Sequence, residues 1–231
     1  MLIVLDVTGT APLRVPNVKA WEEAYRRFET PQEEIRKFIR RLRAMGASNW
    51  AKDSRIVELF CGRGNGLIAL AELGFKRIEG VDLSSSLLAQ YTGMAPCYTG
   101  DCRYLPFHSR SRDAIVIQGG LHHLQILPED LKQCLGEMHR VLTDQGHVVI
   151  IEPWLTPFLS CVHWACRQKI ARLLSTKLDS LAIMIEHERD TYSQWLGQPD
   201  TIRNAIERYF IPTRYECRWG KLIFAGRKRI A

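Results

Sequence analysis

Ile56-Val-Glu58-Leu-Phe-Cys61-Gly62-Arg-Gly64-Asn-Gly66 is the stretch that decides the fold of this chain. A short apolar run, Arg55–Phe60, leads into three glycines, and an apolar segment with helical spacing, Leu67–Leu73, follows them. Glycines allow the backbone to turn sharply and to approach a ligand closely. A strand, a glycine-rich turn and a helix in this order are typical of a ligand-binding βα unit.

An acidic residue separates two interpretations of the glycine loop, residues 60–66. A dinucleotide loop presents open amides at a helix N-terminus to a pyrophosphate group. Glu58 stands directly before the glycines, where its charge would repel phosphate. A carboxylate in that place suits a cationic amino-acid group, bound directly or through water.

The pattern then alternates between strands and helices. The predicted strands are Ile78–Leu83, Pro96–Thr99, Ala114–Gln118 and His147–Ile151, with a helix at Leu131–Leu142 that Gly146 is predicted to end. This alternation implies a parallel sheet wound on both faces. Residues 154–200 are predicted to be mainly helical, and two β-like runs, Thr213–Arg218 and Leu222–Arg227, close the chain.

A helix start precedes the first strand. In Thr30-Pro31-Gln32-Glu33, Thr30 accepts from the third helical amide, Pro31 suits the first helical position, and Glu33 closes a capping box. The helix continues to Gly46 with one apolar stripe. Its other face carries Arg36, Lys37, Arg40, Arg41 and Arg43.

Two further acids follow predicted strands. Asp82 closes the second strand 18 residues after Gly64, where a carboxylate can accept both hydroxyls of a ribose. The competing interpretation is a helix cap, for which Ser84 is the better candidate. Asp101 ends the third strand and either accepts from an adenine amino group or is a turn residue.

Taken in order, these features resemble the class I S-adenosylmethionine (SAM)-dependent methyltransferases, most of all their small-molecule, type 11 branch. That branch includes the ubiquinone/menaquinone and sterol C-methyltransferases. The resemblance covers residues 50–153 and rests on Glu58 with the glycine loop, Asp82, Asp101, Ile117-Gln118, His122-His123-Leu124 and the Glu137–Pro153 segment.

The resemblance implies an α/β fold with a Rossmann-like, seven-stranded, mostly parallel sheet, helices on both faces and an antiparallel last strand near Leu222–Arg227. It implies one methyltransferase domain over residues 1–231. We expect an N-terminal helical cap at 1–50, a SAM-binding core at 51–153, a helical lid at 154–200 and C-terminal strands at 201–231 that complete the sheet.

The resemblance also implies the cofactor site. The glycine loop holds the methionine part of SAM, Asp82 the ribose and Asp101 the adenine. The expected cofactor-binding residues are Glu58, Cys61, Gly62, Gly64, Asp82, Leu83, Asp101, Cys102 and Gln118. The expected chemistry is methyl transfer from SAM, with S-adenosylhomocysteine as the product and no metal.

One departure from the branch concerns the substrate. Phe60 stands where the branch usually has glycine, and Glu-Leu-Phe-Cys-Gly is similar to a loop of RNA uridine methyltransferases. The net charge of +7 also fits an acidic partner. Gln118-Gly-Gly-Leu-His-His123, however, contains neither the Pro nor the Cys that RNA and base methyltransferases place there. Aromatic residues of the lid, such as Trp154 and Phe158, favour a small, partly apolar acceptor. An RNA methyltransferase and a non-catalytic SAM-binding partner subunit remain alternatives.

Two adjacent histidines follow the fourth strand. On an extended segment their side chains would point apart, so a shared metal ion is not expected. His122 lies nearer the strand end and is the candidate general base, because a neutral imidazole accepts a proton. Packing beneath the cofactor is the competing interpretation.

Composition bounds the remaining expectations. Seven cysteines without a Cys-x-x-Cys pair are typical of free thiols in a reducing cytosol. A signal peptide is not expected, because the stretch that begins at Met1 lacks a basic leader and a long apolar core. A membrane-spanning segment is not expected, because Glu152, Pro153 and Pro157 interrupt the most apolar stretch. The sequence therefore predicts a cytoplasmic protein, and it leaves peripheral membrane contact and the oligomeric state open.

Overall fold

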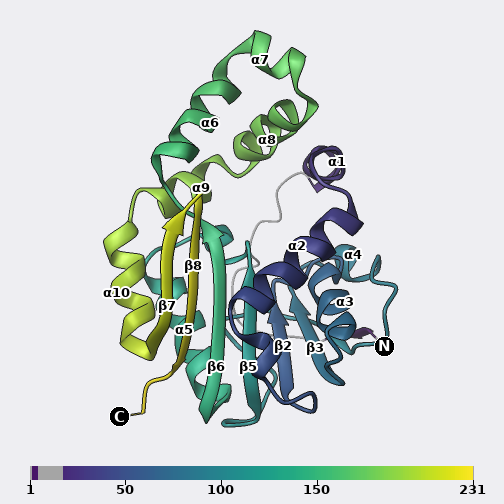
Figure 1. Cartoon of the computed structure of the whole chain (residues 1–231), viewed down its shortest axis with the longest axis vertical. Coiled ribbons are helices and arrows are strands. Elements are labelled where there is room, and N and C mark those ends of the chain that lie inside the picture. The colour runs from purple at the N-terminus through teal and green to yellow at the C-terminus, as the bar shows by residue number, and fades with distance from the viewer. Residues whose placement is uncertain (1, 5–17, 231) are drawn as a thin grey trace.

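A computed structural model describes residues 2–4 and 18–230, and its strands form one mixed sheet in the order β1-β4-β3-β2-β5-β6-β8-β7 (Figure 1). The strands are β1 (Leu2–Val4), β2 (Arg55–Leu59), β3 (Arg77–Asp82), β4 (Cys97–Thr99), β5 (Arg112–Gln118), β6 (Leu142–Pro153), β7 (Phe210–Arg218) and β8 (Lys221–Lys228). All pairs from β1 to β6 are parallel, and β8 lies antiparallel between β6 and β7. The predicted seven-stranded arrangement with its antiparallel last strand is confirmed. The short edge strand β1, paired with β4, adds an eighth strand that the sequence did not predict.

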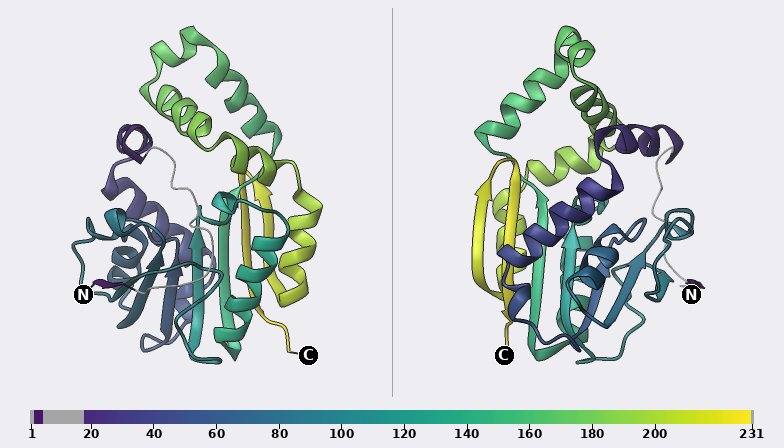
Figure 2. Two further views of the ribbon diagram at one scale, coloured as in Figure 1. Left: turned by 180° about the vertical axis from the view of Figure 1, so that it is seen from behind. Right: turned by 45° about the vertical axis from the view of Figure 1, so that its right-hand side comes forward.

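Helices cover both faces of this sheet (Figure 2). They are α1 (Val18–Phe28), α2 (Pro31–Ala44), α3 (Asn65–Glu72), α4 (Ser85–Leu88), α5 (Glu129–Val141), α6 (Pro157–Arg167), α7 (Lys169–Leu174), α8 (Thr176–His187), α9 (Arg189–Leu196) and α10 (Pro199–Tyr209). Two short 3₁₀ turns, Ala47–Asn49 and Leu121–His123, complete the regular structure of the described residues.

Alternation along the central strands divides the core into two layers. Ile115 and Ile117 of β5 pack with residues of α5 and α10 on one face. Ala114 and Val116 pack with residues of α2 and α3 on the other. Successive strand side chains point to opposite faces, so an uninterrupted apolar run is what a strand covered on both faces requires.

Two boundaries differ from the sequence prediction. Gly146 does not end the helix, because α5 ends at Val141 and β6 begins at Leu142. Leu142 continues the apolar spacing of the helix, but its backbone is extended (φ −70°, ψ 139°) and it pairs with Arg112 of β5. The segment 201–231 also opens with α10 before its two strands.

Helices α1, α6, α7 and α8 lie above the carboxyl ends of the strands (Figure 1).

The predicted capping box is present at the start of α2: the Glu33 amide donates to Thr30 Oγ1 at 3.3 Å, and the Thr30 amide donates to Glu33 Oε2 at 3.0 Å. Helix α1 packs against α8, and the ion pair Arg27–Asp179 (3.6 Å) joins them. Among the described residues, none of the helices combines the length and the hydropathy that crossing a membrane requires.

Candidate active site

The glycine loop leaves β2 through a sequence of left-handed backbone conformations. Phe60, Gly62 and Gly64 have φ values of 57°, 50° and 76°. This conformation is costly for a residue that has a Cβ, by about 1–2 kcal/mol. Phe60 therefore stands at a position whose backbone favours glycine, and its ring fills the space that a side chain at Gly120 would need, since a Cβ there would lie 2.2 Å from Phe60 Cγ. Phe60 stands where the family usually has glycine, and Gly120 leaves the space that the Phe60 ring occupies.

Glu58 lies beneath this loop at the end of β2 and is 3% exposed. A Cβ at Gly66 would lie 1.8 Å from Glu58 Oε1, so the first turn of α3 leaves just enough room for the carboxylate. Burial raises the pKa of Glu58 well above its usual range, and the charges of Glu34 and Asp82 raise it further. Its Oε2 atom is buried without a hydrogen-bond partner. A cationic group placed there would satisfy both the charge and the oxygen.

Asp82 lies at the end of β3 and closes the glycine loop. Its Oδ2 accepts from the Gly62 amide at 2.7 Å, and its Oδ1 accepts from the Ser84 amide at 2.8 Å. Burial raises the pKa of Asp82, and these two hydrogen bonds act against the rise. Ser84 is the cap of α4, because its hydroxyl accepts from the Leu87 amide at 3.2 Å. Asp82 therefore does not cap α4, because Ser84 fills that role.

A cavity of about 1210 Å³ joins these groups to the lid. Of the predicted cofactor residues, it is lined by Glu58, Cys61, Gly62, Asp82, Leu83 and Gln118. Both polar atoms of the Gln118 side chain, at the end of β5, are buried without a hydrogen-bond partner. A buried amide without a partner costs free energy unless a ligand satisfies it.

Three predicted cofactor residues do not line the cavity. Gly64 lies against Tyr91, where a Cβ would come within 2.1 Å of the ring. Asp101 is held by Arg103, whose Nη2 donates to Asp101 Oδ2 at 2.6 Å, and Arg103 also pairs with Asp130. Cys102 packs in the core layer that includes Cys134. Contacts of Asp101 and Cys102 with adenine remain predictions.

The two histidines lie in the 3₁₀ turn after β5, and the prediction that their side chains point apart is wrong. The turn bends the backbone, so their ring centroids lie only 4.1 Å apart. His122 Nδ1 lies 2.7 Å from Glu152 Oε2, and Glu152 Oε1 accepts from the amides of Gly120 and Leu121 at 2.8 Å each. Glu152 is fully buried at the end of β6. It therefore fixes both the turn and the ring of His122.

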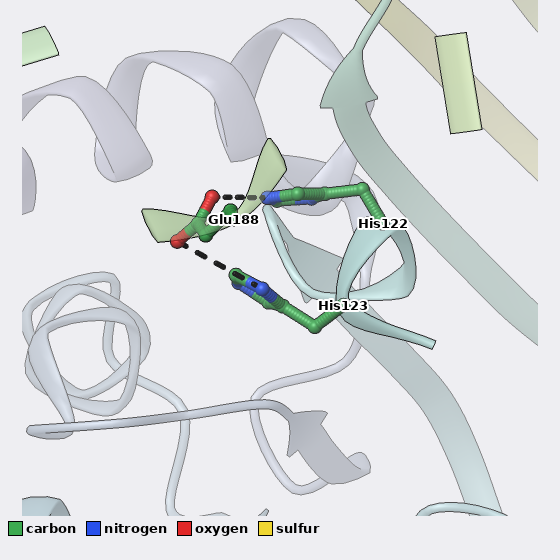
Figure 3. Close-up of side chains that lie close together, drawn as sticks. All are labelled: His122, His123 and Glu188. Carbon is green, nitrogen blue, oxygen red and sulfur yellow. Dashed lines mark ion pairs between the residues drawn. The ribbon is translucent and has the colours of Figure 1, made fainter. Parts of the chain in front are cut away.

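Glu188, from the lid between α8 and α9, faces both histidines (Figure 3). Its Oε2 lies 3.6 Å from His122 Nε2, and its Oε1 lies 3.9 Å from His123 Nδ1. Burial lowers the pKa of His122, but pairing with Glu152 and then with Glu188 outweighs burial and raises that pKa to about 9. Burial and the charge of His122 lower the pKa of His123 to about 4. The two rings thus differ in charge at neutral pH.

Sequence reasoning missed Glu152, Glu188 and Glu34. Glu152 carried a signal, since an acid that ends a buried apolar strand is placed at the ligand edge of the sheet. Glu34 accepts from Asn65 Nδ2 at 2.5 Å and from the Tyr25 hydroxyl, which ties the N-terminal helices to the glycine loop. Glu188 has no local signal, because only the tertiary fold brings it to His122.

The donor set fits the cofactor that the sequence predicts. The unpartnered oxygen of Glu58 suits the amino group of SAM, and Asp82 and the unsatisfied Gln118 line the same cavity. These residues come from the carboxyl ends of neighbouring parallel strands, where open α/β sheets bind their ligands.

A methyltransferase domain family matches residues 57–150. A demethylmenaquinone methyltransferase of Bacteroides fragilis is 31% identical over 119 residues, which cover 46% of this chain and 47% of the relative. The chain therefore aligns with about half the length of the curated relatives that it matches.

Solved structures show the fold over a greater length. A protein of Pyrococcus horikoshii superposes with a TM-score of 0.66 at 18% identity, covering 90% of this chain and 98% of that one. The N-methyltransferase NodS of Bradyrhizobium japonicum superposes with a TM-score of 0.55 at 15% identity, covering 84% and 95%. Residues 57–150 therefore match a methyltransferase domain, which supports a class I SAM-dependent methyltransferase of the type 11 branch, and the fold around them is shared with these solved structures over most of the chain.

Proposed function

We propose that the protein transfers a methyl group from SAM to a small, partly apolar acceptor and releases S-adenosylhomocysteine. The observation that carries the proposal is one continuous cavity, because it joins Glu58, Asp82 and Gln118 on the sheet side to the lid on the other. One space of this kind can hold a cofactor and an acceptor side by side, which is what direct group transfer requires.

The chain's own residues would bind and orient the cofactor. Glu58 would pair with the amino group, Asp82 with the ribose hydroxyls, and Gln118 would hydrogen-bond near the methionine end. When bound, SAM supplies an electrophilic methyl group on a sulfonium. The lid would exclude water and set the angle of approach, and alignment of this kind lowers a barrier without any proton transfer.

The acceptor side of the cavity is mainly apolar, with charged groups of both signs. Its apolar lining includes Phe28, Phe38, Phe158, Leu159, Val162, Leu181 and Ile185. Arg41 and Lys221 line the same cavity. Burial lowers the pKa of Arg41, and burial together with Arg41 lowers the pKa of Lys221 to about 8. An acceptor with an apolar body fits this lining, and a polar end that faces Arg41 and Lys221 would be neutral or negative.

The general-base role of His122 depends on its partners. With a pKa of about 9, His122 carries a proton at neutral pH while Glu152 and Glu188 face it. In that state the ring donates hydrogen bonds and cannot accept a proton. We propose that His122 positions the acceptor, and that it acts as a base only when the interaction with Glu188 changes.

The cofactor assignment is tested by changing Asp82. Asp82→Ala removes two charge-assisted hydrogen bonds to the ribose, worth roughly 1.5–3 kcal/mol each. Affinity for S-adenosylhomocysteine should fall at least about 100-fold, which corresponds to about 3 kcal/mol. Isothermal titration calorimetry measures the change, and Asp53→Ala, at an exposed position away from the cavity, is the matched control. Equal affinities for wild type and Asp82→Ala would remove Asp82 from the site.

The acceptor class is tested with methyl-labelled SAM. Purified protein incubated with a cell extract should label the small-molecule fraction, and the label should disappear in Asp82→Ala. Label in bulk RNA at physiological salt would favour the RNA methyltransferase instead. Cofactor binding without label in any fraction would favour the non-catalytic partner subunit.

A further inference from the structure

We propose that His122, His123 and Glu188 form a binding site for one divalent transition-metal ion on the acceptor side of the cavity. Each residue offers one ligand atom, and the three atoms lie within 4.8 Å of one another (Figure 3). The site is separate from the residues assigned to SAM, so it neither requires nor predicts cofactor binding. It adds an ion-binding function to the proposed methyl transfer.

The spacing of the ligand atoms fits an ion better than it fits direct hydrogen bonds. A charge-assisted N–H···O bond is about 2.7–2.9 Å long, as His122 Nδ1 to Glu152 is at 2.7 Å. Glu188 stands farther off, at 3.6 Å from His122 Nε2 and 3.9 Å from His123 Nδ1. Two ligand atoms that are each about 2.1 Å from a tetrahedral ion lie roughly 3.4 Å apart. Small side-chain rotations would therefore close the three atoms around one ion.

Glu152 supplies the orientation that a metal-binding histidine needs. Such a histidine usually gives its other ring N–H to a carboxylate, which fixes the tautomer and turns the free nitrogen toward the ion. An ion that displaces the Nε2 proton of His122 would leave Nδ1 donating to Glu152 and the lone pair of Nε2 directed at Glu188. Two backbone amides hold the second oxygen of Glu152 in place. The support for the site is therefore built from groups that the cofactor does not use.

The surroundings leave room for a further ligand. The edge of the Tyr192 ring packs against His122, with centroids 6.0 Å apart. The Tyr192 hydroxyl lies 3.1 Å from His163 Nε2, which occupies it. All three proposed ligands line the large cavity, so the remaining coordination positions are open to water or to an acceptor atom.

Two imidazoles and one carboxylate with open positions suit a first-row divalent ion such as Zn²⁺, Fe²⁺ or Mn²⁺. Mg²⁺ and Ca²⁺ prefer sites made of oxygen ligands, so they fit this set poorly. An ion here would hold an oxygen or nitrogen atom of the acceptor at a fixed point in the cavity. The ion would thus contribute positioning and electrostatic attraction.

The experiment is a titration of metal-stripped protein without an affinity tag. Cys161 and Cys217 are exposed free thiols, so both are first replaced by Ser to remove competing soft ligands. Co²⁺ and Zn²⁺ are titrated by absorption and calorimetry. One ion per chain is expected, and His123→Ala and Glu188→Gln should each weaken binding at least about tenfold. Glu152→Gln should weaken it about 10–100-fold through the orientation of His122.

Matched controls make the result specific. His108→Ala and Glu186→Gln change exposed residues of the same types outside the cluster, and both should bind the ion as the parent protein does. Circular dichroism and calorimetry with S-adenosylhomocysteine confirm that each variant is folded. No ion bound by folded, cofactor-competent protein would overturn the proposal, as would equal affinity in His123→Ala and Glu188→Gln. Either result leaves the methyltransferase proposal standing, whereas loss of cofactor binding in the parent would defeat that proposal alone.

Discussion

Gly66 and Gly136 both lie within helices, yet their surroundings differ in tolerance for a side chain. A methyl group at Gly66 would strike Glu58 Oε1 at 1.8 Å, whereas the nearest atom to one at Gly136 is the Tyr209 hydroxyl at 3.8 Å. Gly66→Ala should destabilise the fold by about 1–3 kcal/mol and weaken cofactor binding, because the carboxylate must move. Gly136→Ala should stabilise it by about 0.4–1 kcal/mol through helix propensity. Urea unfolding of both variants measures the difference, and a stabilising Gly66→Ala would contradict the close packing of Glu58.

Three predicted cofactor residues that line the cavity share one property. Glu58, Asp82 and Gln118 end parallel strands, and strand ends can be found from the apolar run that precedes them. Asp101 follows the same rule, but its carboxylate is bound by Arg103 two residues later. Asp101 could pair with Arg103 or with a ligand, and the order of residues in the sequence does not show which partner it takes.

Trp195 connects the lid to the sheet. It is fully buried in α9, and its Nε1 donates to the Pro153 carbonyl at the end of β6 at 2.8 Å. Trp195→Phe should cost about 1–3 kcal/mol, because the carbonyl loses its donor in a buried place. Trp195→Ala should cost about 3–5 kcal/mol through the cavity that it leaves.

Thermal and urea unfolding measure both changes. Trp164→Phe is the matched control within the lid, because Trp164 is 65% exposed and its replacement should stay within about 0.5 kcal/mol. A Trp195→Ala variant as stable as this control would show that α9 does not hold the lid to the sheet.

At the scale of elements, burial decided which features the sequence revealed. The central strands β5 and β6 are apolar runs covered on both faces, and their pattern is unambiguous. The boundary between α5 and β6 was misplaced because Leu142 is fully buried and also continues the apolar spacing of α5, so its apolar character does not distinguish helix from strand. Strand β1 has three residues, too few for a periodic signal.

The whole molecule divides into a cofactor side that is local in sequence and an acceptor side that is not. The predicted cofactor residues that line the cavity fall between Glu58 and Gln118. The acceptor side combines α1 and α2 with the lid and the start of β8, so Trp21, Glu188 and Lys221 line one space. Contacts between segments so far apart depend on packing, which explains why the histidine–glutamate cluster escaped prediction while the residues proposed for SAM could be named from the sequence.

The net charge of +7 leads to a prediction for the molecule as a whole. Arg36, Arg40 and Arg43 lie exposed on the outer side of α2, away from the cavity. A surface of this kind attracts polyanions without regard to sequence. If about three phosphates of a single strand are neutralised, affinity for RNA should fall roughly 20-fold between 50 and 200 mM salt.

Fluorescence anisotropy measures this binding, and poly(U) and poly(A) should give equal affinities. Replacing the three arginines by Glu should abolish RNA binding, while calorimetry should show unchanged affinity for S-adenosylhomocysteine. A preference for one RNA that persists at 200 mM salt would mean that the cavity, and not the charged helix face, recognises nucleic acid, and the small-molecule proposal would then fail.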